Sequence, residues 1–138
     1  MTNRRDILLL SALPAISALA ASGDAAKLPN VTIDPSHAKL DRQPFGDTRI
    51  YFDGPTNQLQ SMTAGSLLLK PGMSPHPPHQ HPEEEIMVVT EGGGEIVVEG
   101  KFTKVGPGSM MYCAAGKLHG VKNTGTQPLL FYFYKWRT

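Results

Sequence analysis

The chain has 138 residues, a length that suits one domain, and its 40% hydrophobic and 18% charged residues exclude a wholly disordered protein. Its 13 Lys and Arg against 12 Asp and Glu give a formal net charge of +1, and no run of like charge is longer than residues 83–85, which excludes a nucleic-acid-binding surface. The single cysteine, Cys113, excludes a disulfide within the chain and a zinc site made of cysteines.

Residues 1–20 are predicted to be a cleavable signal peptide. Charged residues at positions 4–6 precede an apolar run that begins at Ile7, and Ala18-Leu19-Ala20 supplies a cleavage site of small residues. Two serines and Pro14 interrupt the run, so we expect no permanent membrane anchor. The mature protein is therefore predicted to be periplasmic or secreted.

Two routes of export fit this signal. Arg4 and Arg5 resemble the start of a twin-arginine signal, a type associated with proteins that fold, often around a cofactor, before they cross the membrane. Residues 6–8 depart from that pattern, so the general route for unfolded chains is an alternative. A third interpretation, an amphipathic helix of the folded domain, is disfavoured because the run has no polar face.

Residues 21–46 are predicted to be an arm packed on the domain, because Gly23 and three prolines interrupt their short apolar pieces. Residues 47–138 are predicted to form an all-β sandwich or barrel, since short apolar stretches recur between glycine and proline turns with almost no helical period. The expected strands are 48–52, 59–69, 85–90, 94–99, 101–105, 109–113, 119–122 and 129–134.

The chemistry is concentrated in residues 74–85, which hold three of the five histidines. In an extended chain alternate side chains share a face, so His79, His81 and Glu85 should point the same way. This alternation also includes Glu83, so phase alone leaves two candidate carboxylates. For a further imidazole we favour His119, which opens an apolar run after a glycine turn, over a histidine in the arm.

The first of two spaced motifs runs from Gly72 through His79-x-His81 and Glu85 to Gly92, and it resembles the first motif of the cupin superfamily. One extra residue separates its first glycine from its first histidine. The resemblance selects Glu85 over Glu83 as the carboxylate ligand.

The second motif runs from Gly108 through Ala114-x-Gly116 and His119 to Asn123, and it resembles the second cupin motif, with alanine where the family usually has proline. Together the two motifs imply a double-stranded β-helix, or jelly-roll, cupin barrel. They also imply a metal site made of four residues: His79, His81, Glu85 and His119.

Three imidazoles and one carboxylate, without a thiolate, suit a divalent transition metal ion: Mn, Fe, Ni, Co or Zn. Four protein ligands on an octahedral ion leave two positions for a small-molecule substrate or dioxygen. The first hypothesis is an exported metal-dependent enzyme, similar to a dioxygenase, isomerase or decarboxylase, that acts on a small oxygen-rich molecule. The alternatives are a non-catalytic cupin that binds a small polar ligand or metal ion, and a structural cupin.

Other residues receive simpler interpretations. His76 is expected to face away from His79 as a surface-loop histidine, and the carboxylates at 83 and 84 are expected to be solvated. Cys113 is expected to pack in the core. The terminal aromatic stretch from Phe131 to Trp136 should place one face in the core and leave the other for a subunit contact, so a homodimer is one interpretation.

Overall fold

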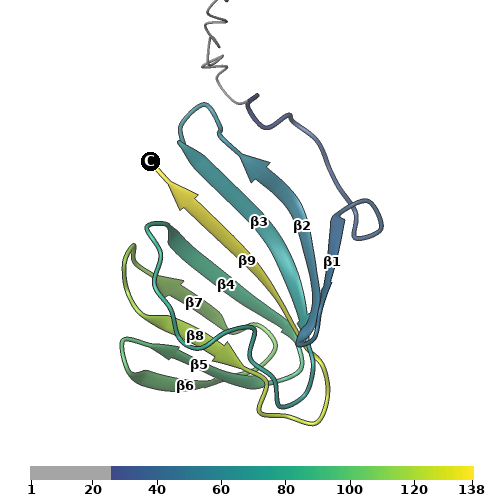
Figure 1. Ribbon diagram of the computed structural model, residues 1–138, viewed down its shortest axis with the longest axis vertical. Coiled ribbons are helices and arrows are strands. Elements are labelled where there is room, and N and C mark those ends of the chain that lie inside the picture. The colour runs from purple at the N-terminus through teal and green to yellow at the C-terminus, as the bar shows by residue number, and fades with distance from the viewer. Residues whose placement is uncertain (1–25) are drawn as a thin grey trace, which may run out of the picture.

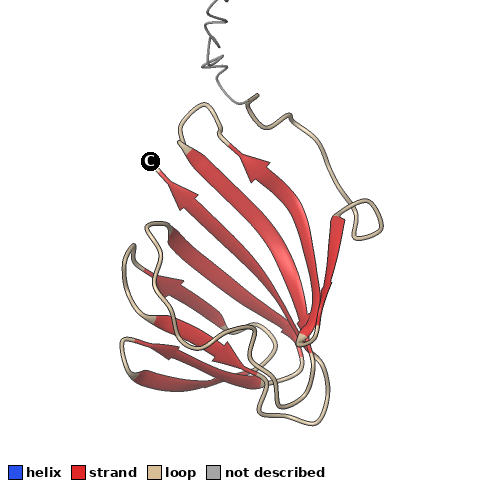
Figure 2. Ribbon diagram, viewed as in Figure 1, coloured by secondary structure: helices blue, strands red, loops and turns tan. Residues whose placement is uncertain are grey.

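The computed structural model describes residues 26–138, so the predicted signal peptide, residues 1–20, lies outside the described residues. The described chain forms strands joined by turns and loops, without helices (Figure 2). None of it forms a helix long and apolar enough to cross a membrane. The strands are β1 (Lys39–Gln43), β2 (Gly46–Gly54), β3 (Ser61–Leu69), β4 (Glu84–Glu91), β5 (Gly94–Val98), β6 (Lys101–Val105), β7 (Met110–Cys113), β8 (His119–Lys122) and β9 (Leu129–Arg137).

The strands form two antiparallel sheets, which confirms the all-β prediction (Figure 1). The large sheet has the order β1-β2-β3-β9-β4-β7, and the small sheet has the order β6-β5-β8. The last strand of the chain, β9, lies between β3 and β4 with an unbroken register against β3. Because β9 pairs with both neighbours, it joins the early strands β1, β2 and β3 to β4 and β7 in the large sheet.

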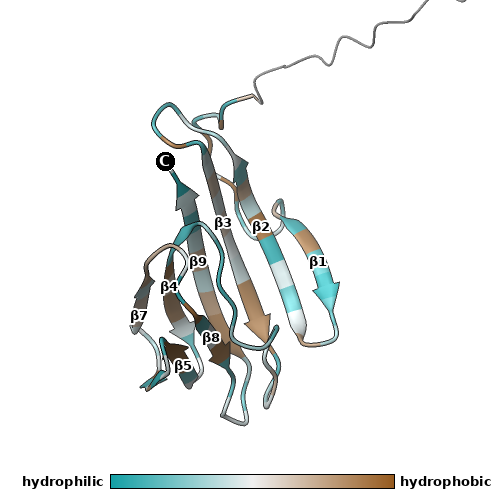
Figure 3. Cartoon of the chain, turned by 60° about the vertical axis from the view of Figure 1, so that its left-hand side comes forward, coloured by the Kyte–Doolittle hydropathy of each residue, from teal (hydrophilic) through white to brown (hydrophobic). Residues whose placement is uncertain are grey.

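The hydrophobic core lies between the two sheets. It takes alternate residues from both, among them Leu67 of β3, Met87 of β4, Ile96 of β5 and Val121 of β8. Figure 3 shows the hydrophobic colouring concentrated on β5 and β8, where the small sheet faces the large one. Alternation of this kind buries one face of each strand, which is why the sequence shows period-two patterning there.

The strand β1 has no counterpart among the expected strands, because residues 21–46 show no apolar alternation. The structure pairs Lys39–Gln43 with β2 as the edge of the large sheet. Four of its five residues are exposed, and Figure 3 shows it mostly hydrophilic. An edge strand with neither face in the core leaves no hydrophobic pattern in the sequence. The end of β9 was also predicted too early, because its last residues are not fully buried and leave little hydrophobic pattern. The strand continues three residues past the predicted Tyr134.

The two glycines of the first motif differ in why a larger residue would not fit there. Gly72 and Gly92 both have left-handed backbone, with φ of +75° and +76°. A Cβ atom added at Gly92 would lie 2.3 Å from the carbonyl oxygen of Pro128, whereas one added at Gly72 would meet no atom within 4 Å. Gly92 is therefore required by both conformation and space, and Gly72 by conformation alone.

This difference predicts unequal losses of stability. Gly72→Ala should lower the free energy of unfolding by about 1 kcal/mol, the cost of left-handed backbone for alanine. Gly92→Ala should lower it by about 3 kcal/mol, because the strain is joined by a clash with backbone. Urea unfolding of both variants measures the two losses, and equal losses would show that the chain beside Pro128 moves aside at no cost.

Candidate functional site

The candidate site is held together by backbone pairing between the two motifs. The segment before β4 is a loop, but at His79 it forms an isolated antiparallel bridge with His119, the first residue of β8. The amide of each residue donates to the carbonyl of the other, with both nitrogen–oxygen distances at 2.9 Å. A third bond, from the amide of Gly116 to the carbonyl of His81 at 2.8 Å, fixes the next turn of the loop. Residues 40 positions apart are thereby placed side by side.

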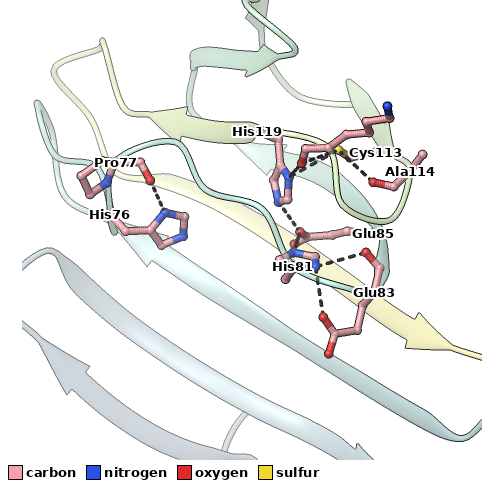
Figure 4. A network of polar contacts seen from close by, with 9 residues as sticks. His76, Pro77, His81, Glu83, Glu85, Cys113, Ala114 and His119 are labelled. Carbon is pink, nitrogen blue, oxygen red and sulfur yellow. Dashed lines mark hydrogen bonds and ion pairs between the residues drawn. The ribbon is translucent and has the colours of Figure 1, made fainter.

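Glu85 lies at the centre of the site, on the inward face of β4. Its side chain is 4% exposed, and its Oε2 atom lies 2.7 Å from Nε2 of His119 and 3.0 Å from Nε2 of His81 (Figure 4). The Nδ1 atoms of these rings lie 3.0 Å from the carbonyl of Lys117 and 3.1 Å from that of Glu83. A carbonyl accepts only, so each Nδ1 carries a hydrogen, and each Nε2 faces the carboxylate.

The three imidazole rings surround one point at steep mutual angles. The ring centroid of His79 lies 5.3 Å from that of His81 and 5.0 Å from that of His119. The ring centroids of His81 and His119 lie 4.8 Å apart. One ligand atom from each ring lies within 4.8 Å of the others. The structure therefore brings together all four residues that the motifs single out, and the three histidines could hold a metal ion.

The ionisation of the site favours a neutral His79, a charged Glu85 and a proton held by His119 against that carboxylate. Burial, together with the charges of His76, His119 and His81, lowers the pKa of His79 to about 4. Burial acts to raise the pKa of Glu85, but the hydrogen bonds from His119 and His81 outweigh it, so this pKa is lowered. The hydrogen bond to Glu85 raises the pKa of His119. At neutral pH His79 therefore offers a lone pair, while a cation at the site would compete with the proton on His119.

The neighbouring glutamates are not the solvated carboxylates that the sequence suggested. Glu83 places a carboxylate oxygen 3.1 Å from Nδ1 of His81, on the side of that ring turned away from Glu85 (Figure 4). Glu84 lies on the outer face, where it accepts hydrogen bonds from the Tyr112 hydroxyl at 2.6 Å and from the Trp136 indole at 2.9 Å. Glu83 is thus placed to orient a histidine, and Glu84 holds three strands of the outer face together.

The expectation that His76 faces away from His79 is wrong. The two rings stack, with centroids 3.6 Å apart and an interplanar angle of 24°. Residues 74–78 are not a regular strand, so the alternation used for the prediction does not apply to them. Nδ1 of His76 lies 2.8 Å from the carbonyl of Pro77, to which it donates, and this leaves Nε2 as an acceptor.

Cys113 belongs to the core, as predicted, and it also touches the site. Its sulfur lies 3.3 Å from Nδ1 of His119 and 3.5 Å from the carbonyl of Lys117. Burial raises the pKa of the thiol, so it stays protonated at neutral pH. The thiol packs beside the bond that sets the tautomer of His119.

The histidines open into a cavity of about 160 Å³ between the two sheets. Its walls are largely apolar, with Phe45, Leu67 and Phe133 among them, and its polar lining includes Lys135. Lys135, which interrupts the terminal aromatic stretch, was not among the residues predicted for the site. The available signal was its phase, because Phe131, Phe133 and Lys135 alternate on one face of β9.

A larger groove of about 560 Å³ lies against the small sheet and is lined in part by Val97, Phe102 and Pro78. It shares Pro75, His76 and Val121 with the histidine cavity. The stacked His76 ring therefore stands at the boundary between the two hollows.

Residues 65–134 match the model of the cupin domain family. No curated protein sequence matches the chain.

Solved structures with the same fold share little sequence with this chain. KdgF from Halomonas sp. is 20% identical with a TM-score of 0.65, and the match covers 80% of this chain and 96% of KdgF. An RmlC-like cupin from Shewanella frigidimarina is 13% identical with a TM-score of 0.66, covering 81% of this chain and 94% of that one. The polyketide cyclase RemF from Streptomyces resistomycificus is 23% identical with a TM-score of 0.62, covering 78% of this chain and 80% of RemF.

The geometry predicts which of the consecutive glutamates controls metal uptake. Glu85→Gln keeps the size of the side chain but removes the charge beside His81 and His119, so metal affinity should fall at least about tenfold. Glu84→Gln is the matched control, since its carboxylate lies on the outer face, and its metal content should equal that of the wild type. Metal analysis of identically purified proteins decides the matter. Loss of metal in the Glu84 variant with retention in the Glu85 variant would contradict the assignment.

Proposed function

Because the chain belongs to the cupin domain family and gathers three histidines around one buried carboxylate, we propose that it is an exported metal-dependent enzyme acting on a small, oxygen-rich molecule. The observation that carries the proposal is the shared contact of His81 and His119 with one oxygen of Glu85. Because carbonyls hold the Nδ1 hydrogens, both imidazoles turn Nε2 toward the same carboxylate, and a proton must lie between each Nε2 and the anion for a hydrogen bond to form. A metal ion can take the place of that proton.

The donor set fits a divalent transition metal ion. Two ligands bound at about 2.1 Å to one octahedral ion, at right angles to each other, lie about 3 Å apart. The separations of Glu85 Oε2 from the two imidazole nitrogens, 2.7 and 3.0 Å, are close to that value. Nitrogen and carboxylate ligands without a thiolate suit Mn, Fe, Co, Ni or Zn.

The four residues His79, His81, Glu85 and His119 would hold the ion, which when bound supplies a Lewis acid or an oxygen-binding centre. Glu83 and the Lys117 carbonyl orient two of the imidazoles from behind. The largely apolar walls make the cavity less polar than bulk solvent, which strengthens electrostatic contacts with a substrate that covers them. His76 offers an acceptor nitrogen at the cavity wall, where it can hold a hydroxyl of a bound molecule.

The structural neighbours support an enzyme to a limited extent. RemF, one of them, is a polyketide cyclase, so this fold can carry an enzyme. At 23% identity the likeness shows the fold alone. The reaction type is therefore proposed from the site and not from the neighbour.

Export is supported by residues 1–20 of the sequence. The charged start, the interrupted apolar run and the small-residue site at 18–20 fit a cleaved signal peptide. Folding before export would let the protein bind Mn or Fe where zinc and copper do not outcompete them. N-terminal sequencing of protein recovered outside the cytoplasm should find a start near Ala21, and an intact Met1 on cytoplasmic protein would contradict export.

Turnover distinguishes the enzyme from a cupin that only binds. Fe(II)-loaded protein should consume a catechol or a β-diketone with uptake of oxygen, or should convert the compound without uptake if it is an isomerase or decarboxylase. His119→Gln should abolish conversion, whereas His37→Gln should not, because His37 is exposed on the arm and paired with Asp34. Binding of these compounds without any conversion, followed by NMR, would favour the non-catalytic alternative.

A further inference from the structure

Lys135 brings a cationic side chain to the wall of the histidine cavity. It lies on β9 directly beside Glu85 of β4, with the Cα atoms of the two residues paired in the antiparallel register. It lines the same cavity as His79 and His81. Its ammonium nitrogen lies 6.0 Å from the ring centroid of Phe133, the preceding residue on that face.

This cation has no anionic partner within the part of the chain that the structure describes. None of the ion pairs found there, at nitrogen–oxygen distances up to 4.0 Å, includes Lys135. The neighbouring carboxylate of Glu85 is turned to His81 and His119 instead. Lys135 is partly buried, and a lysine that lines a largely apolar cavity without an ion-pair partner among the described residues favours the entry of an anion there.

The charges of the site then determine the charge of its ligand, a step that rests on the proposed function. A divalent ion, the Lys135 ammonium and the Glu85 carboxylate leave the cavity with two positive charges. A neutral molecule would leave both uncompensated, whereas a monocarboxylate with an oxygen toward the metal site and another toward Lys135 would compensate one of them.

The space beside the histidines limits the part of the ligand that reaches them. It is about 160 Å³, which is room for a small group of heavy atoms. We propose that the cavity binds a small carboxylate with a second oxygen donor beside it, a hydroxy or keto acid, and that Lys135 is the residue that selects its negative charge.

Glycolate and glycolamide test this assignment, because they share one skeleton and differ in charge. In Co(II)-loaded protein, Lys135→Met should weaken glycolate binding at least about tenfold in titration calorimetry and change glycolamide binding less than about twofold. Lys135→Arg should restore most of the affinity for glycolate. Lys122→Met is the matched control, since that exposed lysine lies at the end of β8 outside the histidine cavity, and it should match the wild type.

Several outcomes would overturn the inference. Unchanged glycolate affinity in Lys135→Met, or an equal loss for both probes, would show that Lys135 does not read charge. Repeating the titration on metal-free protein separates this inference from the proposed function. Failure of the wild type to take up metal would contradict the proposed function. Glycolate binding to that metal-free protein that still depended on Lys135 would support the anion site. No glycolate binding with or without metal would contradict the anion site itself.

Discussion

The paired hydrogen bonds between the backbones of His79 and His119 are the constraint on which the candidate site depends. They join the loop before β4 to the start of β8, and so they bring the two histidine-bearing motifs to one place. Backbone pairing of this kind fixes position without using the side chains, which stay free for ligands. The insertion of β9 between β3 and β4 then supplies the opposite wall, with Lys135 next to Glu85.

Around that pairing, each polar side chain of the site has a role set by its neighbours. Carbonyls hold Nδ1 of His81 and His119, Glu85 receives their Nε2 atoms, and burial keeps His79 neutral through its lowered pKa. A buried carboxylate that contacts two imidazoles is costly unless its charge is compensated. The charge of Lys135 likewise calls for a charge of opposite sign, and because no ion pair of the described residues includes this lysine, we infer that the ligand supplies it.

The sequence singled out the residues of the candidate site but not its surroundings. Spaced motifs pointed to His79, His81, Glu85 and His119, which the structure brings together, because the spacing of residues is a property of the chain itself. The stacking of His76 could not be predicted, since it depends on an irregular proline-rich loop where no alternation applies. The edge strand β1 was missed because exposed strands carry no hydrophobic pattern, and Lys135 was missed because its aromatic neighbours dominate that stretch.

The position of the bound ion tests the central claim most directly. A crystal structure of the Co(II)-loaded protein should show an anomalous peak in the cavity, about 2.0–2.2 Å from Nε2 of His81 and His119 and from an oxygen of Glu85. A peak at the exposed pair of Asp34 and His37 alone, with none in the cavity of a folded protein, would contradict the account.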